Sequence, residues 1–232
     1  MADIIWKGKS SRDIDGLIIT DLPPITKPKM RTNKIEIDGR DGDIVEKVGY
    51  ESYIKSIGVG LTRNFNIDEV INYFTGDGEL ILSDEPNKVY IASIYDSVDF
   101  DRLLSMRKAT IKFYVQPYKY LKNEDKVELD VSTQTSIEVE NKGLEVSKPI
   151  FNLEGSGTIE IAVNNIGIFK YTFPDNETKV TIDSLKEEAY LDGIYKNRNM
   201  LGEFPELLVG TNIISWTGSL TKISIEPKSR WL

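Results

Sequence analysis

The second half of the chain alternates short apolar and polar runs with turn residues, and this pattern restricts the possible folds more than any other feature. From residue 127 onward, roughly eight or more such runs follow one another about 8–12 residues apart, with no helical period among them. Asn164-Asn165 joins two of the runs and tolerates the left-handed backbone of a tight hairpin. The pattern predicts a galectin-like or jelly-roll β-sandwich for this half of the chain.

Particular residues of this half predict one turn and three further strands. Gly155-Ser156-Gly157 lacks the Gly-Lys-Ser/Thr that a phosphate loop requires, so we interpret it as a turn between strands. Residues 189–195, 212–216 and 221–225 are each predicted to form one separate strand.

The first half is also rich in strand patterns and contains one helix pattern. Strands are predicted at residues 4–6, 17–19, 53–61, 79–82 and 88–95. In the third of these, Gly58 and Gly60 indicate the close approach of another backbone. Residues 67–74 carry Ile67, Val70, Ile71 and Phe74 at helical spacing. Because Asn66 supplies an N-cap and Gly76 a stop, these residues predict a helix that covers one side of a sheet.

A further hairpin is expected near the end of this half. Residues 97–103 alternate through Val98 and Phe100, and residues 109–115 follow after a polar turn. Pro117 has no N–H to donate, so the second strand is predicted to stop there.

Residues 34–46, with the sequence KIEIDGRDGDIVE, predict a hairpin with a polar tip. Ile35 and Ile37 alternate with charged residues, as in a strand that has one buried face. Glycines on both sides of Arg40-Asp41 allow a positive φ at two points and therefore a sharp reversal. The pattern fits a solvated hairpin, and it fits an arm that leaves its own domain and docks on a neighbour.

A polar and charged stretch at residues 121–135 separates the two halves, as is typical of a domain boundary. We therefore predict two domains, residues 1–125 and 126–232. Pro117, Tyr118 and Tyr120 lie just before this stretch and are predicted to contribute to the domain junction.

The chain contains no histidine and no cysteine, which excludes several catalytic chemistries. A Ser-His-Asp or Cys-His nucleophile, a disulfide and an ordinary zinc site are ruled out. A net charge of −8 disfavours a nucleic acid backbone as ligand. No run approaches the ~18 apolar residues of a membrane span, and the first residues lack the pattern of a secretory signal. We expect no catalysis and no cofactor, and we keep a carboxylate-only glycosidase as an alternative.

Three aromatic residues near the end of the chain are candidates for contact with a saccharide or a partner. Phe204, Trp216 and Trp231 could stack on sugar rings if they were exposed on a sandwich face. Large aromatic side chains are mostly buried, however, so we favour a place for them in the core or at the domain junction.

Several separate stretches, in a shared order, resemble the distal tail proteins of siphophages that infect Gram-positive hosts. The resemblance rests on the hairpin tip Gly39-Arg40-Asp41-Gly42, on residues 112–120 (KFYVQPYKY), and on the turns at 141–143 and 147–149. It continues through residues 154–157, 182–184, 202–207 and 210–212, and ends with 227–232 (PKSRWL).

The resemblance implies a structural protein of the virion tail, assembled in the host cytoplasm. In that family an N-terminal β-rich domain with a hairpin belt and one helix closes into a hexameric ring, here residues 1–125, and the C-terminal sandwich projects outward. The implied partners are the tail tube protein, the tape measure, the tail-associated tip protein and, further, the receptor-binding protein. DNA would pass through the bore without specific binding, and no membrane is involved.

The hairpin tip would then form the contact between subunits. The residues implied are Ile37, Asp38, Gly39, Arg40, Asp41 and Gly42. Larger relatives carry an inserted carbohydrate-binding module for which this chain has no room, so any grip on host saccharide would fall to the sandwich itself. The alternative function is a carbohydrate-binding adhesin that recognises saccharide of the host cell wall.

Overall fold

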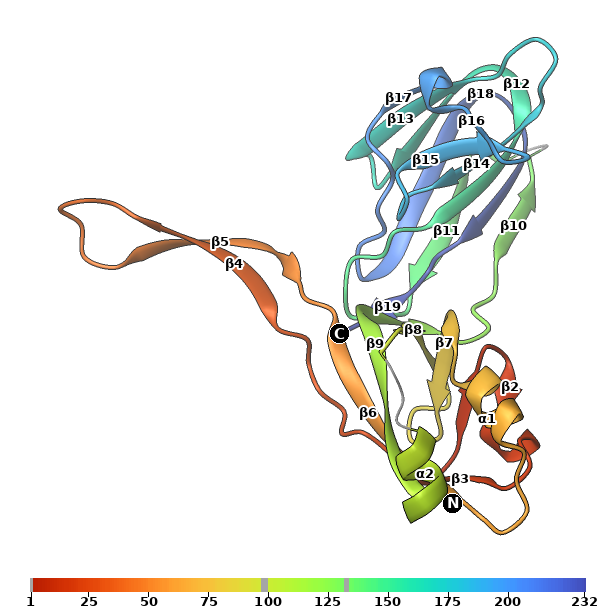
Figure 1. Cartoon of the computed structure of the whole chain (residues 1–232). Coiled ribbons are helices and arrows are strands. Elements are labelled where there is room, and N and C mark those ends of the chain that lie inside the picture. Colours follow the sequence, from red (N-terminus) through yellow and green to blue (C-terminus); the bar gives the residue numbers. More distant parts are fainter. Residues whose placement is uncertain (1, 97–99, 132–133) are drawn as a thin grey trace. The chain divides into compact units, whose positions relative to one another are not determined.

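The computed structural model describes residues 2–96, 100–131 and 134–232. The chain divides into two compact units, Met1–Lys122 together with Leu232, and Asn123–Trp231. Each unit has its own hydrophobic core and its own main β-sheet (Figure 1). The predicted fold class, a mainly β chain with a sandwich in its second half, is confirmed.

The main sheet of the first unit is antiparallel, in the order β2-β1-β7-β8-β9-β6-β3. Its strands are β1 (Ile4–Trp6), β2 (Lys9–Ser10), β3 (Leu17–Asp21), β6 (Tyr53–Leu61), β7 (Gly76–Leu82), β8 (Lys88–Ile94) and β9 (Lys108–Leu121), and the 3-10 helix η1 (Ser11–Asp13) precedes β3. Alternate residues face a common core, in which Trp6 and Phe113 meet edge to face. A Cβ atom on Gly58 would lie 3.3 Å from the backbone nitrogen of Asp21 on β3, which confirms the predicted close approach.

The predicted helix is present as α1 (Ile67–Tyr73). The side chain of Asn66 accepts hydrogen bonds from two N–H groups of the first turn, at 3.1 and 3.3 Å, and so caps the helix as predicted. Val70 is fully buried, whereas Ile71 is 38% exposed. The buried face is therefore narrower than the predicted apolar stripe.

A second helix, α2 (Phe100–Met106), occupies most of the segment predicted as the first strand of a hairpin, so that prediction is wrong. The start of the predicted strand, at residues 97–99, lies outside the described residues. The alternation rested on Val98 and Phe100 alone. Phe100, Leu103 and Leu104 instead fit the helical spacing i, i+3, i+4, and Leu103 is fully buried in the core.

β9 continues past Pro117, so the prediction that proline ends this strand is also wrong. Tyr90 of β8 pairs with Lys119, and Ala92 pairs with Val115. One residue of β8 therefore faces three residues of β9, which is a bulge. The bulge removes Pro117 from the ladder, where its missing N–H costs no hydrogen bond.

The predicted hairpin forms as β4 (Met30–Glu36) and β5 (Asp43–Tyr50), which pair with each other and are longer than predicted. Ile35 lies opposite Ile44 in the register. We call residues 30–50 the arm.

The sheet of the second unit follows the path β10-β18-β12-β14-β15-β16. Its elements are β10 (Val127–Asp130), β11 (Ser136–Asn141), β12 (Ile150–Val163), β13 (Gly167–Thr172), β14 (Lys179–Asp183), β15 (Glu188–Leu191), β16 (Ile194–Tyr195), η2 (Asn197–Asn199), β17 (Met200–Gly202) and β18 (Gly210–Glu226), and β19 (Arg230–Trp231) follows. The first half of β12 pairs with β14 and its second half with β13, so the sheet curls around the core.

Two predictions for this unit are wrong for the same reason: each placed a break where the structure has one continuous strand. Gly155-Ser156-Gly157 lies inside β12, and the two strands predicted at 212–216 and 221–225 are one strand, β18. β12 and β18 pair across irregularities that begin at Glu154/Gly155. A Cβ atom on Gly155 would lie 2.5 Å from the carbonyl oxygen of Ser219, so glycine allows the two long strands to bend together without a break.

Short turns are better reflected in the sequence. Asn164 and Asn165 have φ values of 51° and 56° and join β12 to β13, as predicted. The single strand predicted at 189–195 is instead β15 and β16, joined at Asp192 and Gly193 with φ values of 49° and 79°. Asp-Gly is itself a hairpin signal that the strand prediction overlooked.

Candidate assembly site

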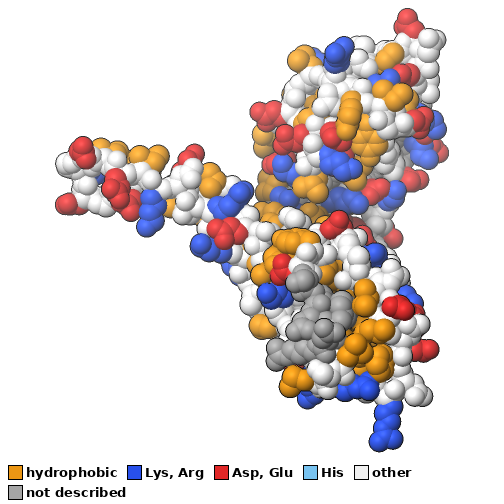
Figure 2. All heavy atoms as spheres, viewed as in Figure 1, with side chains coloured by type: hydrophobic (Ala, Val, Ile, Leu, Met, Phe, Trp, Pro, Cys, Tyr) orange, Lys and Arg blue, Asp and Glu red, His pale blue; other side chains and the backbone are white. Residues whose placement is uncertain are grey.

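The arm is exposed on both faces over its whole length. Every residue from 31 to 49 is exposed, and Ile35, Ile37 and Ile44 keep 49%, 45% and 39% of their surface in solvent. Figure 2 shows orange hydrophobic side chains along the arm and red acidic ones at its tip. The predicted apolar face exists, but the prediction that it is buried is wrong for the single chain, because no described residue covers it.

The two faces of the arm differ in character. Directly opposed residues of a strand pair point to the same face, so Ile35 and Ile44 share one face. The other face carries charged side chains, among them Lys34 and Asp43, whose charged atoms lie 3.9 Å apart. Residues 36–46 hold five acidic side chains and one basic one, a net charge of −4. The outer half of the arm is therefore apolar on one face and acidic overall.

The six predicted interface residues all lie at the tip of the arm and are exposed. Gly39 and Gly42 have φ values of 81° and 80°, which confirms the two predicted points of positive φ. The backbone N–H of Arg40 donates to the carbonyl oxygen of Ile37 at 3.1 Å, which closes the turn. The side chains of Arg40 and Asp41 are thus presented to solvent, available to a partner.

Contacts inside the first unit fix the root of the arm. The backbone N–H of Glu51 donates to the carbonyl oxygen of Lys29 at 2.8 Å. The ring of Tyr50 meets that of Tyr118 edge to face, with centroids 6.1 Å apart. With Pro117 and other neighbours, these two tyrosines line an open hollow of about 590 Å³. Of the residues predicted at the domain junction, Pro117 and Tyr118 therefore lie beside the arm root, and Tyr120 pairs with Val89 of β8.

A buried charged cluster lies next to this root. The ammonium of Lys55, a side chain only 1% exposed, donates to the carbonyl oxygen of Pro24 at 3.3 Å and lies 4.8 Å from the ring centroid of Tyr90. Glu85 accepts hydrogen bonds from Lys119, at 2.6 Å, and from the Tyr90 hydroxyl.

Burial and charge shift the pKa values in this cluster. Burial lowers the pKa of Lys55, and the nearby Glu85 carboxylate opposes that shift. Burial would raise the pKa of Glu85, but the hydrogen bonds from Lys119 and Tyr90 outweigh it, so this pKa is lowered. Burial raises the pKa of Tyr53 to about 12. Through its hydrogen bond to Pro24, Lys55 ties the connector before the arm to the sheet.

Lys55 is not among the site residues predicted from the sequence. The usable signal was its place in the alternation of β6, where Ile57 and Val59 point inward and Lys55 falls on the same face. A lysine on an inward face requires a buried partner.

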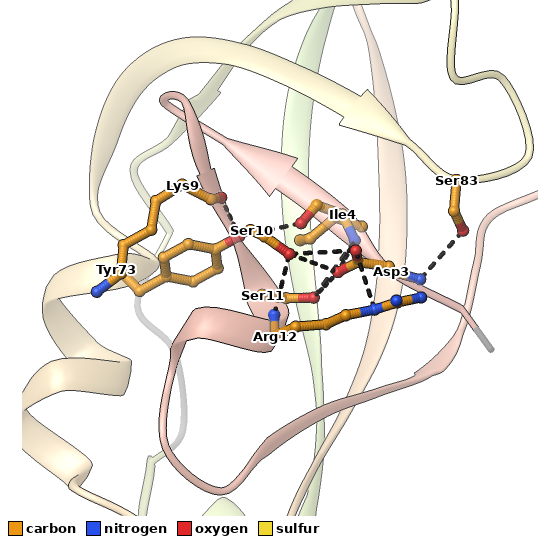
Figure 3. Close-up of polar contacts among 8 residues, drawn as sticks. All are labelled: Asp3, Ile4, Lys9, Ser10, Ser11, Arg12, Tyr73 and Ser83. Carbon is orange, nitrogen blue, oxygen red and sulfur yellow. Dashed lines mark hydrogen bonds and ion pairs between the residues drawn. The ribbon is translucent and has the colours of Figure 1, made fainter.

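A second polar cluster fixes the N-terminal strand (Figure 3). Asp3 accepts hydrogen bonds from the hydroxyls of Ser10 and Ser11, and the Arg12 side chain lies 3.2 Å from its carboxylate. The hydroxyl of Tyr73, on α1, donates to the carbonyl oxygen of Lys9 at 3.1 Å. These contacts tie β2, η1 and α1 to one another and to Asp3, the residue before β1.

Metal-binding groups and membrane-spanning helices were both sought among the described residues. In this part of the chain, no three His, Cys, Asp or Glu side chains are grouped to hold a metal ion. No helix within the described ranges has the length and apolar character to span a membrane.

The three aromatic candidates do not form one exposed face. Trp216 is 5% exposed and belongs to the core of the second unit, as favoured from the sequence. Phe204 packs against that core and lines an open cleft of about 500 Å³ with Lys148 and Glu206, among others. Trp231 is partly exposed.

Comparisons with known proteins agree with this architecture. Residues 12–115, in the first unit, match the family model described as the phage tail protein RIFT-related domain. A comparison with curated protein sequences finds no match.

A solved structure has the same fold over the full length. It is the Dit protein (gp 19.1) of SPP1, described as a paradigm of the hub adsorption apparatus in phages that infect Gram-positive bacteria. The similarity covers 100% of both chains with a TM-score of 0.69 and 17% sequence identity. Together, the match of residues 12–115 to a phage tail domain and the shared fold over the full length confirm the resemblance to siphophage distal tail proteins.

Proposed function

We propose that this protein is the hub of a siphophage tail. It forms a homohexameric ring at the distal end of the tail and joins the tail tube to the tail tip and the adsorption apparatus. Its partners are the tail tube protein, the tape measure, the tail-associated tip protein and the receptor-binding protein. It performs no catalysis, and DNA passes through the bore of the ring without specific binding.

The observation that carries this proposal is the uncovered face of the arm. A two-stranded hairpin on its own is at best marginally stable in water. The hairpin carries three exposed isoleucines. Covering them with another surface would stabilise the hairpin by ~25 cal/mol for each Å² of apolar area removed from water. A contact of the arm with a different part of the next copy is heterologous, and heterologous contacts close into a ring where the rotation between copies permits closure.

The net charge suits a ring that surrounds DNA. A total of 37 acidic and 29 basic side chains gives −8 per chain, and six copies multiply that charge. An acidic wall repels the phosphate backbone and so lets DNA slide without being retained.

The test is the mass of the protein in solution, with and without the tip charges. The unaltered chain is expected to form hexamers, or two hexamers back to back. The variant R40A/D41A is expected to shift the equilibrium toward single chains, because both side chains are assigned to the contact between subunits. The variant K142A/E203A alters one basic and one acidic exposed residue of the second unit and is the matched control. A single chain at high concentration for the unaltered protein would overturn the proposal.

A further inference from the structure

The open cleft of about 500 Å³ in the second unit combines polar and aromatic side chains. Its walls come from the β12–β13 hairpin, the turn between β14 and β15, the residues just before β12 and the loop after β17. A volume of this size lies within the range of small-molecule sites. We call it the sandwich cleft, and the residues that line it include Lys148, Asn164, Ser184, Glu187, Phe204 and Glu206.

Hydrogen bonds fix the walls of the sandwich cleft. Ser147 and Leu207 exchange two backbone hydrogen bonds, at 2.9 and 3.0 Å, and so hold the loop after β17 against the residues before β12. The Asn164 side chain accepts from the N–H of Ile213 at 2.8 Å and donates to the side chain of Asn212 at 2.8 Å. The cleft is therefore formed in advance of any ligand, which lowers the entropy cost of binding.

Two polar groups that line the cleft have no hydrogen-bond partner within the described part of the chain. Ser184 is 1% exposed, and its hydroxyl faces neither a donor nor an acceptor. The ammonium of Lys148 lies 3.6 Å from the Glu187 carboxylate and 3.9 Å from that of Glu206, which is too far for hydrogen bonds. Because polar groups without partners are costly, both groups favour a ligand that supplies one.

The charge of the cleft and its aromatic ring restrict the class of ligand. Glu187, Glu203 and Glu206 together with Lys148 give a net charge of −2, which disfavours an anion. Phe204 offers an apolar surface on which the C–H face of a sugar ring can stack. A cationic side chain only donates hydrogen bonds and would leave the Lys148 ammonium unpaired, whereas a sugar hydroxyl both donates and accepts.

From these features we infer that the sandwich cleft binds an uncharged saccharide. One sugar ring lies against Phe204, and its hydroxyls accept from Lys148 and donate to the carboxylates of Glu187 and Glu206. A further sugar hydroxyl pairs with that of Ser184. The site adds direct contact with a glycan to the proposed hub, and it needs no second copy of the chain, because every lining residue belongs to the second unit.

Saturation-transfer difference NMR on the full chain tests the ligand class, since it observes the ligand and suits single chains and large assemblies alike. The probes are the methyl glycosides of glucose, galactose and N-acetylglucosamine. Saturation of the ring C–H protons of at least one is expected, with the millimolar affinity of a single sugar unit on an open site. Glucuronic acid, which is anionic, and triglycine, which has amides but no sugar ring, are the comparison ligands. Transfer to none of the glycosides, or tighter binding of a comparison ligand, overturns the inference.

Substitutions test the residues assigned to the cleft. K148M and E206Q are each expected to weaken binding by about tenfold, because each removes a hydrogen bond that involves a charged group. K179M and E154Q alter an ion pair of the same unit that lies outside the cleft, and these matched controls are expected to leave binding unchanged. F204L keeps an apolar side chain against the core but removes the ring, and it is expected to weaken binding as well.

S184A separates a binding role from a structural one. Removing a buried hydroxyl that has no partner is expected to leave the free energy of unfolding unchanged or to raise it, and to weaken saccharide binding severalfold. Binding that is equally tight in K148M, E206Q and the unaltered chain overturns the site. A hexamer that binds no glycoside overturns this inference and leaves the hub proposal standing. A single chain that binds one has the opposite consequence.

Discussion

The arm and the β12–β18 pair are both long antiparallel ribbons with alternating apolar residues, yet their surroundings are opposite. In the second unit, Phe151 of β12 and its register partner Ile225 of β18 are both 0% exposed. In the arm, Ile35 and its register partner Ile44 are 49% and 39% exposed. The same sequence period therefore produces an apolar face in both ribbons. Only the face of β12 and β18 is covered by other residues of the chain.

The difference shows what periodicity can and cannot specify. An alternating pattern identifies which side chains share a face, because successive residues of a strand point to opposite sides. It does not identify what covers that face. In the arm, the isoleucine face is left exposed by the rest of the chain. We infer assembly from this exposed face.

Truncating one side chain in each ribbon should give the largest contrast. We expect F151A to destabilise the second unit by about 3–5 kcal/mol, because it removes a fully buried ring and leaves a cavity. We expect I35A to change the free energy of unfolding of the single chain by less than about 0.5 kcal/mol. Urea unfolding measures the free-energy change of each variant. Hydrogen exchange, read separately in β12 peptides and in arm peptides, locates the change. A large loss for I35A in the single chain would mean that the arm packs on its own unit.

Local signals in the sequence predicted local structure well. Asn66 indicated the start of α1 because its side chain can satisfy the free N–H groups of the first turn. Asn164 and Asn165 indicated the hairpin between β12 and β13 because asparagine tolerates positive φ. Gly39 and Gly42 indicated the turn at the arm tip because glycine also adopts positive φ.

Features that depend on a distant strand could not be predicted. Pro117 was expected to end β9, but a three-against-one bulge opposite β8 accommodates it. Gly155 was expected in a turn, but the approach of β18 makes it part of a continuous strand.

A second contrast compares ion pairs, one at the arm root and one on the arm. The Glu85 pair with Lys119 has side chains 13% and 11% exposed, and the Lys34 pair with Asp43 has side chains 66% and 35% exposed. We expect E85Q to cost about 2 kcal/mol, between the values for surface and fully buried pairs, because it leaves Lys55 and Lys119 without their carboxylate. K34A should cost less than about 0.5 kcal/mol.

The pH dependence of E85Q tests the cause of this cost. The pKa of Glu85 is lowered in the folded chain: burial opposes the shift, and the hydrogen bonds from Lys119 and Tyr90 outweigh it. The carboxylate therefore stabilises the first unit fully above its unfolded pKa, about 4.3. That contribution is lost as the pH falls through the lower folded value. The difference between the unaltered chain and E85Q should thus shrink below pH ~4, as measured by urea unfolding; an equal difference at every pH would contradict the assignment.

Two glycine substitutions separate the effect of packing from that of backbone strain. G155A places a methyl group 2.5 Å from the Ser219 carbonyl oxygen, so β12 and β18 must move apart, at a cost of about 1–2 kcal/mol to the second unit. Gly39 has open space around it but a φ of 81°, so G39A strains the arm tip by about 1 kcal/mol. Because the arm is exposed throughout, that strain should appear as faster hydrogen exchange of arm amides and leave the unfolding of both units unchanged. If G39A instead lowered the stability of the first unit, the arm would be energetically coupled to the sheet, and its two exposed faces would no longer distinguish it from the buried ribbon of β12 and β18.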